Sequence, residues 1–434
     1  MSTEVQGPPP ETTAEAEAAA AESARLAAPE IIAGSLGEYA RIWLRRVRAG
    51  ESGALPVTIG LVAIVVYFQV RNSLFLSAGN LVNLLIQGTP FILLGMAEVF
   101  VLLLGEIDLS VGYNAAMGAM WTAWLAYNVP WWVAVLTGLA FTAAFGMLQG
   151  AFITLLGLPS FVVTLGGFLG LEGLLQVLVP KSGHGAGGTI PISSTIVNDL
   201  TSGNLTPAAG WIVMAAIVVA AGGLLVVRDR RRRASGLVTP PISVTALKVL
   251  VMAAAGVVVV LISDTNRGVG FVTLSGLPWA VLVVLGMLAL WTALLGRTRF
   301  GRYVYAIGGN AEAARRAGVN LVRIRTLAFT LCGLTAGVAG VMYASRLGSI
   351  STNVDGGQLV LFAVASAVIG GTHLFGGRGR MLHALLGGLV VATIYNGLFL
   401  LGLSAAATDI VTAIVLLAAV TVDALARRGA TGTS

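Results

Sequence analysis

Charged residues are scarce in this chain. Asp, Glu, Lys and Arg make up 10% of its 434 residues, whereas a soluble domain carries about 25%. Hydrophobic residues make up 56%, enough for about 12 membrane spans of roughly 20 residues each. Cysteine occurs once, at Cys332, so no intrachain disulfide is possible, and a lone thiol in an apolar segment is usually a packing residue. The composition excludes a soluble enzyme and a secreted disulfide-rich domain, and it indicates an integral membrane protein.

Net charge and glycine content have specific interpretations in such a chain. The formal charge of +7 is explained by arginine-rich cytoplasmic loops, so nucleic acid is not expected as a partner. The 56 glycines suit helices that approach each other closely through small residues in lipid. We therefore expect the lipid bilayer itself to be the main environment of the chain.

Three parts can be distinguished along the sequence. Residues 1–40 are rich in Ala, Glu, Thr and Pro and predict a disordered cytoplasmic tail. Residues 41–428 form the transmembrane domain, and 429–434 a short tail. The domain contains twelve apolar runs, at 55–70, 81–104, 107–127, 131–156, 160–180, 208–227, 248–263, 277–296, 326–345, 359–374, 382–402 and 406–424. The fold class is therefore all-α, a polytopic helical membrane protein with about 10–12 transmembrane helices.

The distribution of basic residues predicts the orientation. If the N-terminus is cytoplasmic and all runs cross, 22 of the 26 Lys and Arg residues lie inside. This asymmetry favours both termini in the cytoplasm. Three loops are then long: 181–207 on the outside, and the basic 228–248 and the longer 297–325 on the inside.

The inner loop 297–325 carries complete signals for a short helix. Asn310 is a good N-cap, and Glu312 in the first turn suits the positive end of the helix. Arg315 and Arg316 suit the last turn, and Gly318 is placed to end the helix. We predict a capped helix at Ala311–Ala317 outside the bilayer. The alternative is a solvated loop. A helix this short is marginally stable alone, so it needs a partner surface.

A second motif lies between two apolar runs, at Gly105–Gly112, and contains Glu106, Asp108 and Ser110. Acids inside a membrane segment are costly, by about 2.5–3.5 kcal/mol each at mid-depth, and normally face a cavity or a partner. The flanking glycines predict a broken helix whose new N-terminus lies near Asp108 or Ser110. Two roles for Asp108 stay open: it caps a helix, or it lines a solute pathway.

Other polar residues have less specific interpretations. The glycine-rich stretch 368–379 lacks the Lys-Ser or Lys-Thr of a phosphate loop, so ATP is not expected to bind there. The histidines 184, 373 and 383 show no metal-ligand spacing, and no metal site is expected. Glu98 and Glu172, in apolar runs, either bond to neighbouring helices or line a pathway.

Several motifs together resemble one family. Glu312-Ala313-Ala314 followed by Gly318 resembles the EAA loop of permease subunits of ATP-binding-cassette importers. The stretch from Phe300 to Asn310, the octet Gly105–Gly112 and the glycine-rich stretch 368–379 resemble the sugar branch of those permeases. Similarity extends to Pro159–Leu165 and Arg267–Val269.

This resemblance implies a function, a location and partners. The chain would be a permease subunit, without an ATPase site of its own, in the bacterial cytoplasmic membrane. Its partners would be an ATPase that holds ATP and Mg, an extracytoplasmic sugar-binding protein and a second permease copy. No cofactor is expected on this chain. The residues expected to dock the ATPase are Gly308, Gly309, Asn310, Glu312, Ala313, Ala314, Arg315 and Gly318.

The resemblance also suggests the solute. Glu106 and the basic insertion at 228–248 resemble D-xylose permeases, so the solute would be D-xylose or a related monosaccharide. The chain departs from many relatives at Val360, Leu361 and Phe362, where they carry acids, and at Tyr395, where they carry Asp.

A pore for a sugar needs only weak hydroxyl and amide contacts. The candidates are Asn83, Gln87, Ser110 and Asn396, together with Glu106 and Asp108. An alternative function is a proton- or sodium-coupled secondary transporter with Glu106 and Asp108 as its ion site. The capped inner helix has no role in that alternative.

Overall fold

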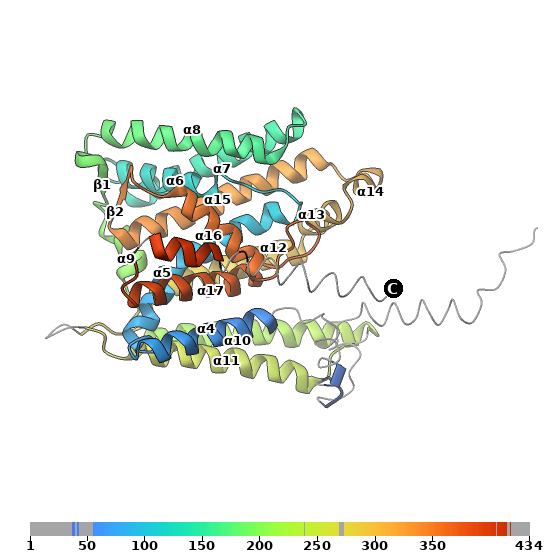
Figure 1. Cartoon of the computed structure of the whole chain (residues 1–434). Helices are drawn as coiled ribbons and strands as arrows, with labels where there is room; N and C mark the ends of the chain where they lie inside the picture. The colour runs from blue at the N-terminus through green and yellow to red at the C-terminus, as the bar shows by residue number, and fades with distance from the viewer. Residues whose placement is uncertain are drawn as a thin grey trace, which may run out of the picture. The chain divides into compact units, whose positions relative to one another are not determined.

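The computed structural model is almost entirely helical (Figure 1). It describes residues 37–39, 41–42, 55–237, 239–268, 273–404, 406–414 and 417. The tail predicted at 1–40, apart from 37–39, and the tail predicted at 429–434 lie outside these residues. The chain divides into two compact units, one of residues 53–210 and 260–434, the other of residues 1–52 and 211–259.

Twelve α-helices of the larger unit follow the predicted apolar runs and the loops between them. They are α4 (Leu55–Arg71), α5 (Ala78–Leu102), α6 (Val111–Leu125), α7 (Trp131–Leu155), α8 (Ser160–Lys181), α9 (Thr195–Ser202), α12 (Trp279–Arg297), α13 (Arg299–Gly309), α14 (Ala311–Arg316), α15 (Leu321–Leu347), α16 (Gly356–Ile369) and α17 (Met381–Leu400). Residues 406–414 are also helical.

The all-α prediction is confirmed. Among the described residues, eight helices are long and apolar enough to cross a membrane: α5, α7, α8, α10, α11, α12, α15 and α17. The apolar helices α4 and α16 are shorter, and α6 has 15 residues. These lengths are compatible with the predicted number of crossings, while the side on which each terminus lies stays a prediction.

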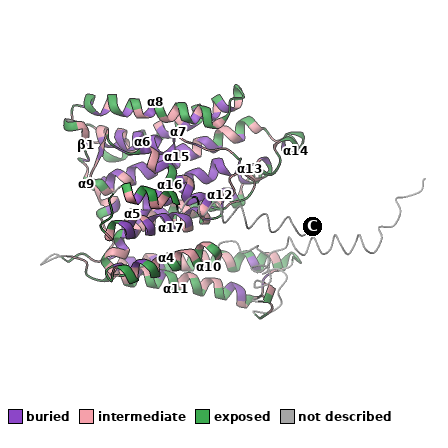
Figure 2. Ribbon diagram, in the orientation of Figure 1, coloured by how far each residue is buried: buried purple, intermediate pink, exposed green. Residues whose placement is uncertain are grey.

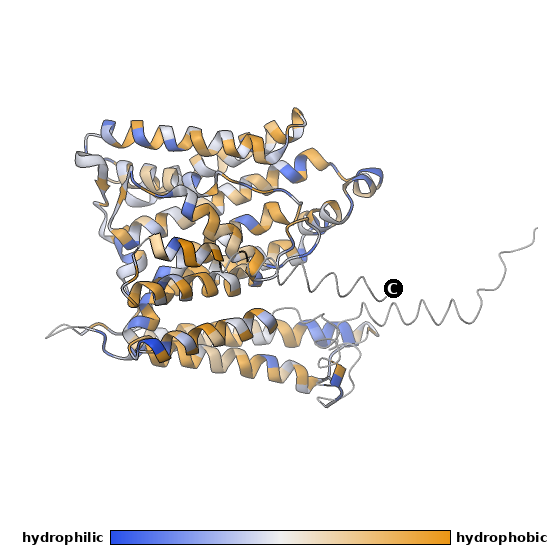
Figure 3. Cartoon of the chain, in the orientation of Figure 1, coloured by the Kyte–Doolittle hydropathy of each residue, from blue (hydrophilic) through white to orange (hydrophobic). Residues whose placement is uncertain are grey.

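Two long helices form the centre of the larger unit. The helix α5 packs against α15, α16 and α17, and α15 also packs against α6 and α7. In α5, 89% of the residues in its most apolar 18-residue stretch are buried, whereas in the corresponding stretch of α8 only 22% are buried (Figure 2). Peripheral helices such as α8 nevertheless expose large apolar side chains, among them Phe161, Leu165 and Leu169, and Figure 3 shows how much of the unit is hydrophobic. An apolar outer surface is what a bilayer requires.

Glycine makes the close packing of α15 possible. A Cβ atom on Gly340 would lie 1.9 Å from the carbonyl oxygen of Ala115 in α6, and one on Gly333 would lie 2.2 Å from that of Thr142 in α7. Any side chain at these positions would force the helices apart. The role that the composition suggested for glycine is therefore confirmed here.

The predicted outer loop 181–207 has a structure of its own. It contains a 3₁₀ turn at Ala186–Gly188, the strand β1 (Thr189–Pro191) and α9. β1 pairs antiparallel with β2 (Ser349–Ser351), and Ile190 and Ile350 lie opposite each other. Both isoleucines are buried. This pairing fixes the loop to the end of α15.

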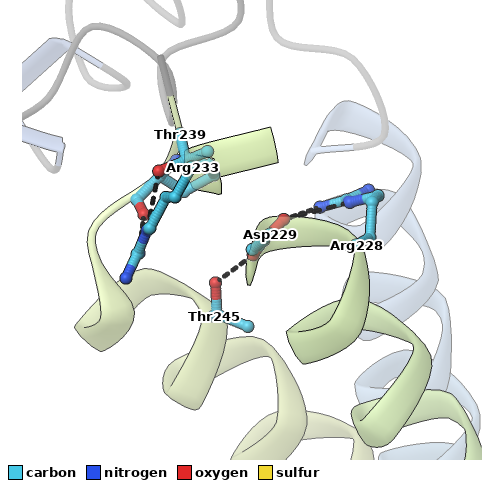
Figure 4. A network of polar contacts seen from close by, with 6 residues as sticks. Arg228, Asp229, Arg233, Thr239 and Thr245 are labelled. Atoms are coloured by element: carbon cyan, nitrogen blue, oxygen red, sulfur yellow. Dashed lines mark hydrogen bonds and ion pairs between the residues drawn. The ribbon is translucent and has the colours of Figure 1, made fainter. Parts of the chain in front are cut away.

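The described helices of the smaller unit are α10 (Pro207–Ala234, which begins in the larger unit) and α11 (Ile242–Asp264, which ends there). The range predicted as the basic inner loop, 228–248, is therefore helical except for its middle. Polar contacts hold this end together (Figure 4). The Thr245 hydroxyl donates to Asp229 at 2.7 Å, Arg228 pairs with the same carboxylate at 3.0 Å, and the Arg233 guanidinium donates to Thr239 Oγ1 at 2.8 Å.

Candidate functional site

The short helix predicted in the inner loop is present as α14. It runs from Ala311 to Arg316, one residue shorter than predicted, and the Asn310 side chain accepts a hydrogen bond from the Ala313 backbone N–H at 2.9 Å. Gly318 has φ +82°, the left-handed conformation that ends a helix and favours glycine. Both predicted caps are therefore confirmed.

α14 presents a mostly exposed surface. Only Ala314 is buried among its residues. Glu312 pairs with Arg315 at 2.9 Å and with Arg316 at 3.1 Å, one helical turn away. These hydrogen bonds from the two guanidinium groups hold the pKa of Glu312 below its ordinary value. The helix is stabilised internally, while its outward face is free to meet another molecule.

Gly308, at the end of α13, packs closely against the backbone of two other segments of the larger unit. A Cβ atom there would lie 1.8 Å from the carbonyl oxygen of Leu103 and 2.5 Å from the backbone nitrogen of Gly377. That nitrogen also donates to the Leu103 carbonyl at 2.9 Å. The end of α5, the end of α13 and the glycine-rich loop before α17 therefore meet backbone to backbone. Gly309, in contrast, faces open space.

A second contact secures the same junction. The Tyr305 hydroxyl, on α13, donates to the carbonyl oxygen of Gly379 at 2.8 Å. Tyr305 is partly buried, and its burial raises the pKa of its hydroxyl, so it keeps its proton and remains a donor at physiological pH. The glycine-rich loop thus supports α13, a role that needs neither ATP nor a phosphate.

The predicted break in the membrane helix lies directly beyond this junction. α5 ends at Leu102, Gly105 has φ +77°, and α6 begins at Val111 with Ser110 as its N-cap. The predicted new N-terminus near Ser110 is therefore confirmed. Asp108 accepts hydrogen bonds from the Ser110 backbone N–H at 2.9 Å and from its hydroxyl at 2.6 Å. It thus supports the start of α6 while being completely buried.

Asp108 and Ser110 belong to a buried polar cluster at this break. The Gln149 amide, from α7, donates to Ser110 Oγ at 2.9 Å, and the Cys332 thiol, from α15, donates to the second Asp108 oxygen at 3.6 Å. Glu98 is also fully buried, and neither of its carboxyl oxygens has a hydrogen-bond partner in the described part of the chain. Cys332 is buried in the apolar core, as predicted for a packing residue, and the tertiary fold also places its thiol against Asp108.

Glu106 does not join this cluster. Its carboxylate lies 3.6 Å from the guanidinium of Arg325, and both side chains are partly exposed. Arg325 is the fifth residue of α15, the helix that follows α14. Neither Arg325 nor Gln149 was predicted as a site residue, and Cys332 was predicted only as a packing residue. Each is a polar residue in or beside an apolar run, but only the fold shows that Arg325 meets Glu106, Gln149 meets Ser110 and Cys332 meets Asp108.

The other candidate pathway residues form a separate cluster. The Asn396 amide, in α17, donates to Gln87 Oε1 at 3.1 Å and to Asn80 Oδ1 at 3.0 Å, both in α5. Gln87 and Asn396 are buried. Asn83 is exposed and makes no hydrogen bond within the described residues. Since Gln87 and Glu98 are eleven residues apart on one helix, the two clusters are separated by about 16 Å along it.

The histidines do not meet. The His184 ring stacks on Tyr127 at 3.7 Å, and His373 Nδ1 accepts from the Phe375 backbone N–H at 3.3 Å. No group of three or more His, Cys, Asp or Glu residues that could hold a metal ion was found where the structure is described.

This architecture defines a multi-pass helical membrane protein with a broken central helix and a short, exposed helix between α13 and α15. Residues 80–420 match the family described as "Branched-chain amino acid transport system / permease component", and the chain belongs to that family. It is a permease subunit of a transport system, in the bacterial inner membrane.

Similar proteins cover most of the chain. The xylose transport system permease protein XylH of Haemophilus influenzae is 33% identical over 86% of this chain and 97% of its own length. XylH of Escherichia coli K12 is 31% identical over 85% of this chain and 91% of its own length, and the ribose import permease protein RbsC of the same strain is 30% identical over 84% and 92%. No solved structure matched the chain.

Proposed function

We propose that this chain forms the translocation pathway of an ATP-driven monosaccharide importer and that α14 is the point at which an ATPase subunit docks. The observation that carries the proposal is the backbone junction at Gly308. It connects an exposed, internally stabilised helix to the break in α5 and α6, where the buried acids lie. A force applied to α14 therefore reaches the membrane interior without passing through a flexible segment.

Two contacts transmit the movement of α14. α13 precedes it and abuts Leu103 through Gly308, next to Gly105. α15 follows it and pairs Arg325 with Glu106. Both routes end on the same turn of chain, residues 103–110. Closure of the ATPase would then favour a different arrangement of this turn, because docked α14 has unequal contacts in the two states.

The polar clusters are candidates for the pathway wall. In the conformation described here Asn80 and Asn396 bond reciprocally and Asn396 also donates to Gln87 Oε1, so most of these amide groups are occupied by one another. Separation of α5 and α17 would release several neutral amide donors and acceptors, which suit sugar hydroxyls. Glu98 has no hydrogen-bond partner among the described residues, so an opening between α5 and α15 would give its carboxyl group water or a solute to bind.

The solute is proposed to be D-xylose or a related monosaccharide. The name of the matching family refers to branched-chain amino acids, while relatives that span nearly their whole length with this chain are named for xylose and ribose. An amino acid carries two charges, whereas the Asn80, Gln87 and Asn396 cluster is neutral. The proposed partners are an ATPase subunit that holds ATP and Mg²⁺, an extracytoplasmic sugar-binding protein and a second copy of this chain.

The test is uptake of labelled xylose by proteoliposomes that contain the chain, its ATPase and its binding protein. Ala313→Trp places a bulky side chain on the exposed face of α14 and should abolish both ATPase association and ATP-dependent uptake. Ala234→Trp, on an equally exposed alanine at the end of α10, is the matched control and should change neither. If uptake by the Ala313→Trp variant equals that of the control, docking at α14 is wrong. Uptake that ignores ATP and collapses with an uncoupler would instead support the ion-coupled alternative.

A further inference from the structure

A pocket of about 420 Å³ lies between the first turns of α13 and α15. Its lining includes Arg299 and Phe300 from α13, and Asn320, Arg323, Ile324 and Leu327 from the start of α15. The loop after α14 contributes to its wall, but no residue of α14 does. The pocket is therefore distinct from the docking face proposed above.

Two arginines give the lining of the pocket a positive charge. Arg299 and Arg323 are exposed, and neither guanidinium has a hydrogen bond or ion pair with another described residue. Two helices also begin at the pocket, α13 after its N-cap Thr298 and α15 after its N-cap Asn320. A helix N-terminus carries partial positive charge and favours anions. None of the lining residues is acidic. The pocket is thus built for an anionic group.

The lining of the pocket also includes apolar side chains from the starts of α13 and α15. Phe300, Ile324 and Leu327 line it, and Leu327 is six residues into the membrane-spanning helix α15, about 9 Å along its axis. α13 begins two residues after Arg297, the last residue of the membrane-spanning helix α12. Apolar side chains do not contribute to the binding of a free phosphate ion, whereas in a phospholipid the phosphate is covalently linked to apolar acyl chains that such side chains can contact. Basic pockets between membrane helices bind anionic headgroups in this way.

We propose that this pocket binds an anionic phospholipid, with its phosphate between Arg299 and Arg323 and an acyl chain against Phe300, Ile324 and Leu327. The bound lipid bridges α13 and α15, the two helices on either side of α14. It thereby restrains the docking helix from both sides, and it makes the position of α14 depend on the lipid composition of the membrane.

The test is lipid binding by the delipidated full-length chain, measured by native mass spectrometry with phosphatidylglycerol and with phosphatidylcholine. Arg299→Gln with Arg323→Gln should weaken phosphatidylglycerol binding by about tenfold or more, because two charge-assisted contacts are lost. The control is Arg230→Gln with Arg231→Gln, which removes the same charge from exposed residues of α10 and should leave that binding unchanged. Arg299→Lys with Arg323→Lys keeps the charge and shows that the site tolerates substitution.

Four results would overturn the proposal. The first is equal binding of the two lipids by the unaltered chain. The second is an equal loss in the Gln variants of the pocket and of α10, which would mean that only net charge matters. The third is displacement of the lipid by an equal concentration of inorganic phosphate, which would identify a site for a free anion. The fourth is a cross-link between the ATPase subunit and the cysteine of an Arg323→Cys variant, which would show that protein fills the pocket.

A Leu327→Gln variant that loses lipid binding, while the variant with the two lysine substitutions retains it, would support the acyl-chain contact.

Discussion

Gly308 leaves no room for a side chain against Leu103. A Cβ atom would lie 1.8 Å from the Leu103 carbonyl oxygen, whereas one on the adjacent Gly309 would meet nothing within 4 Å. These two neighbours at the end of α13 therefore differ in packing, and they supply a matched pair of substitutions.

Gly308→Ala should therefore impair the protein, and Gly309→Ala should not. Forcing a methyl group into a packed site costs about 1–3 kcal/mol, and here the neighbouring atoms are backbone and cannot rotate away. We expect a lower midpoint of thermal unfolding and a loss of ATP-driven uptake for Gly308→Ala. Identical uptake by the two variants would falsify the junction as a coupling element.

The ion pair between Arg325 and Glu106 should contribute to coupling more than to stability. Its 3.6 Å separation and partial exposure indicate a stabilisation of only about 0.2–1 kcal/mol. Glu106→Gln and Arg325→Gln should each reduce ATP-stimulated uptake, and the double variant should lose little more than either alone. The measurement is a double-mutant cycle on uptake rate and on unfolding. Losses that simply add would mean that the two residues act independently.

Cys332 should report opening of the acid cluster. It is the sole cysteine of the sequence, it is fully buried, and its thiol contacts Asp108. In the resting protein it should react with N-ethylmaleimide far more slowly than in the denatured chain. During ATP-driven turnover, labelling detected by mass spectrometry should accelerate if α15 separates from the break. Rapid labelling at rest would show that the cluster is open to solvent.

Asn396→Ala should destabilise the protein, whereas Asn83→Ala should not. Removing the Asn396 amide leaves the carbonyl oxygens Gln87 Oε1 and Asn80 Oδ1 without their donor, and an unsatisfied polar group at a buried site costs about 1–3 kcal/mol. Asn83 is exposed. We expect a lower unfolding temperature and reduced xylose uptake for Asn396→Ala only. Wild-type uptake by Asn396→Ala would remove this cluster from the proposed pathway.

The stability of α14 should depend on pH through Glu312. Its carboxyl pKa is lowered by Arg315 and Arg316, so the ionised form stabilises the folded helix. This stabilisation is present above the ordinary value of 4.5 and is lost as the pH falls below that value toward the lowered pKa. The protection of the α14 amides against hydrogen exchange, corrected for the pH dependence of the intrinsic exchange rate, should therefore be lower in acid. Glu312→Gln should exchange faster at neutral pH and show no such dependence. Because the pairs are exposed, salt should weaken the effect.

The pattern of the sequence was enough to predict the apolar helices, the caps of α14 at Asn310 and Gly318, and the break before α6. Each depends on residues close together in the chain: a run of apolar side chains long enough to span lipid, a side-chain oxygen three residues before the amide it caps, or glycines beside an acid. Such interactions have the same form in any fold.

Which distant residues meet was decided by the tertiary structure alone. Cys332 reaches Asp108, Arg325 reaches Glu106, and the candidate pathway residues separate into two clusters. These outcomes depend on how α5, α15 and α17 cross and on their rotation about their own axes. Glycine allows the close approach of these helices, at Gly88 and Gly388 between α5 and α17, and at Gly333 and Gly340 between α15 and its neighbours α7 and α6. A glycine shows in the sequence that a close approach is possible, but only the packed structure decides which chain segment makes it.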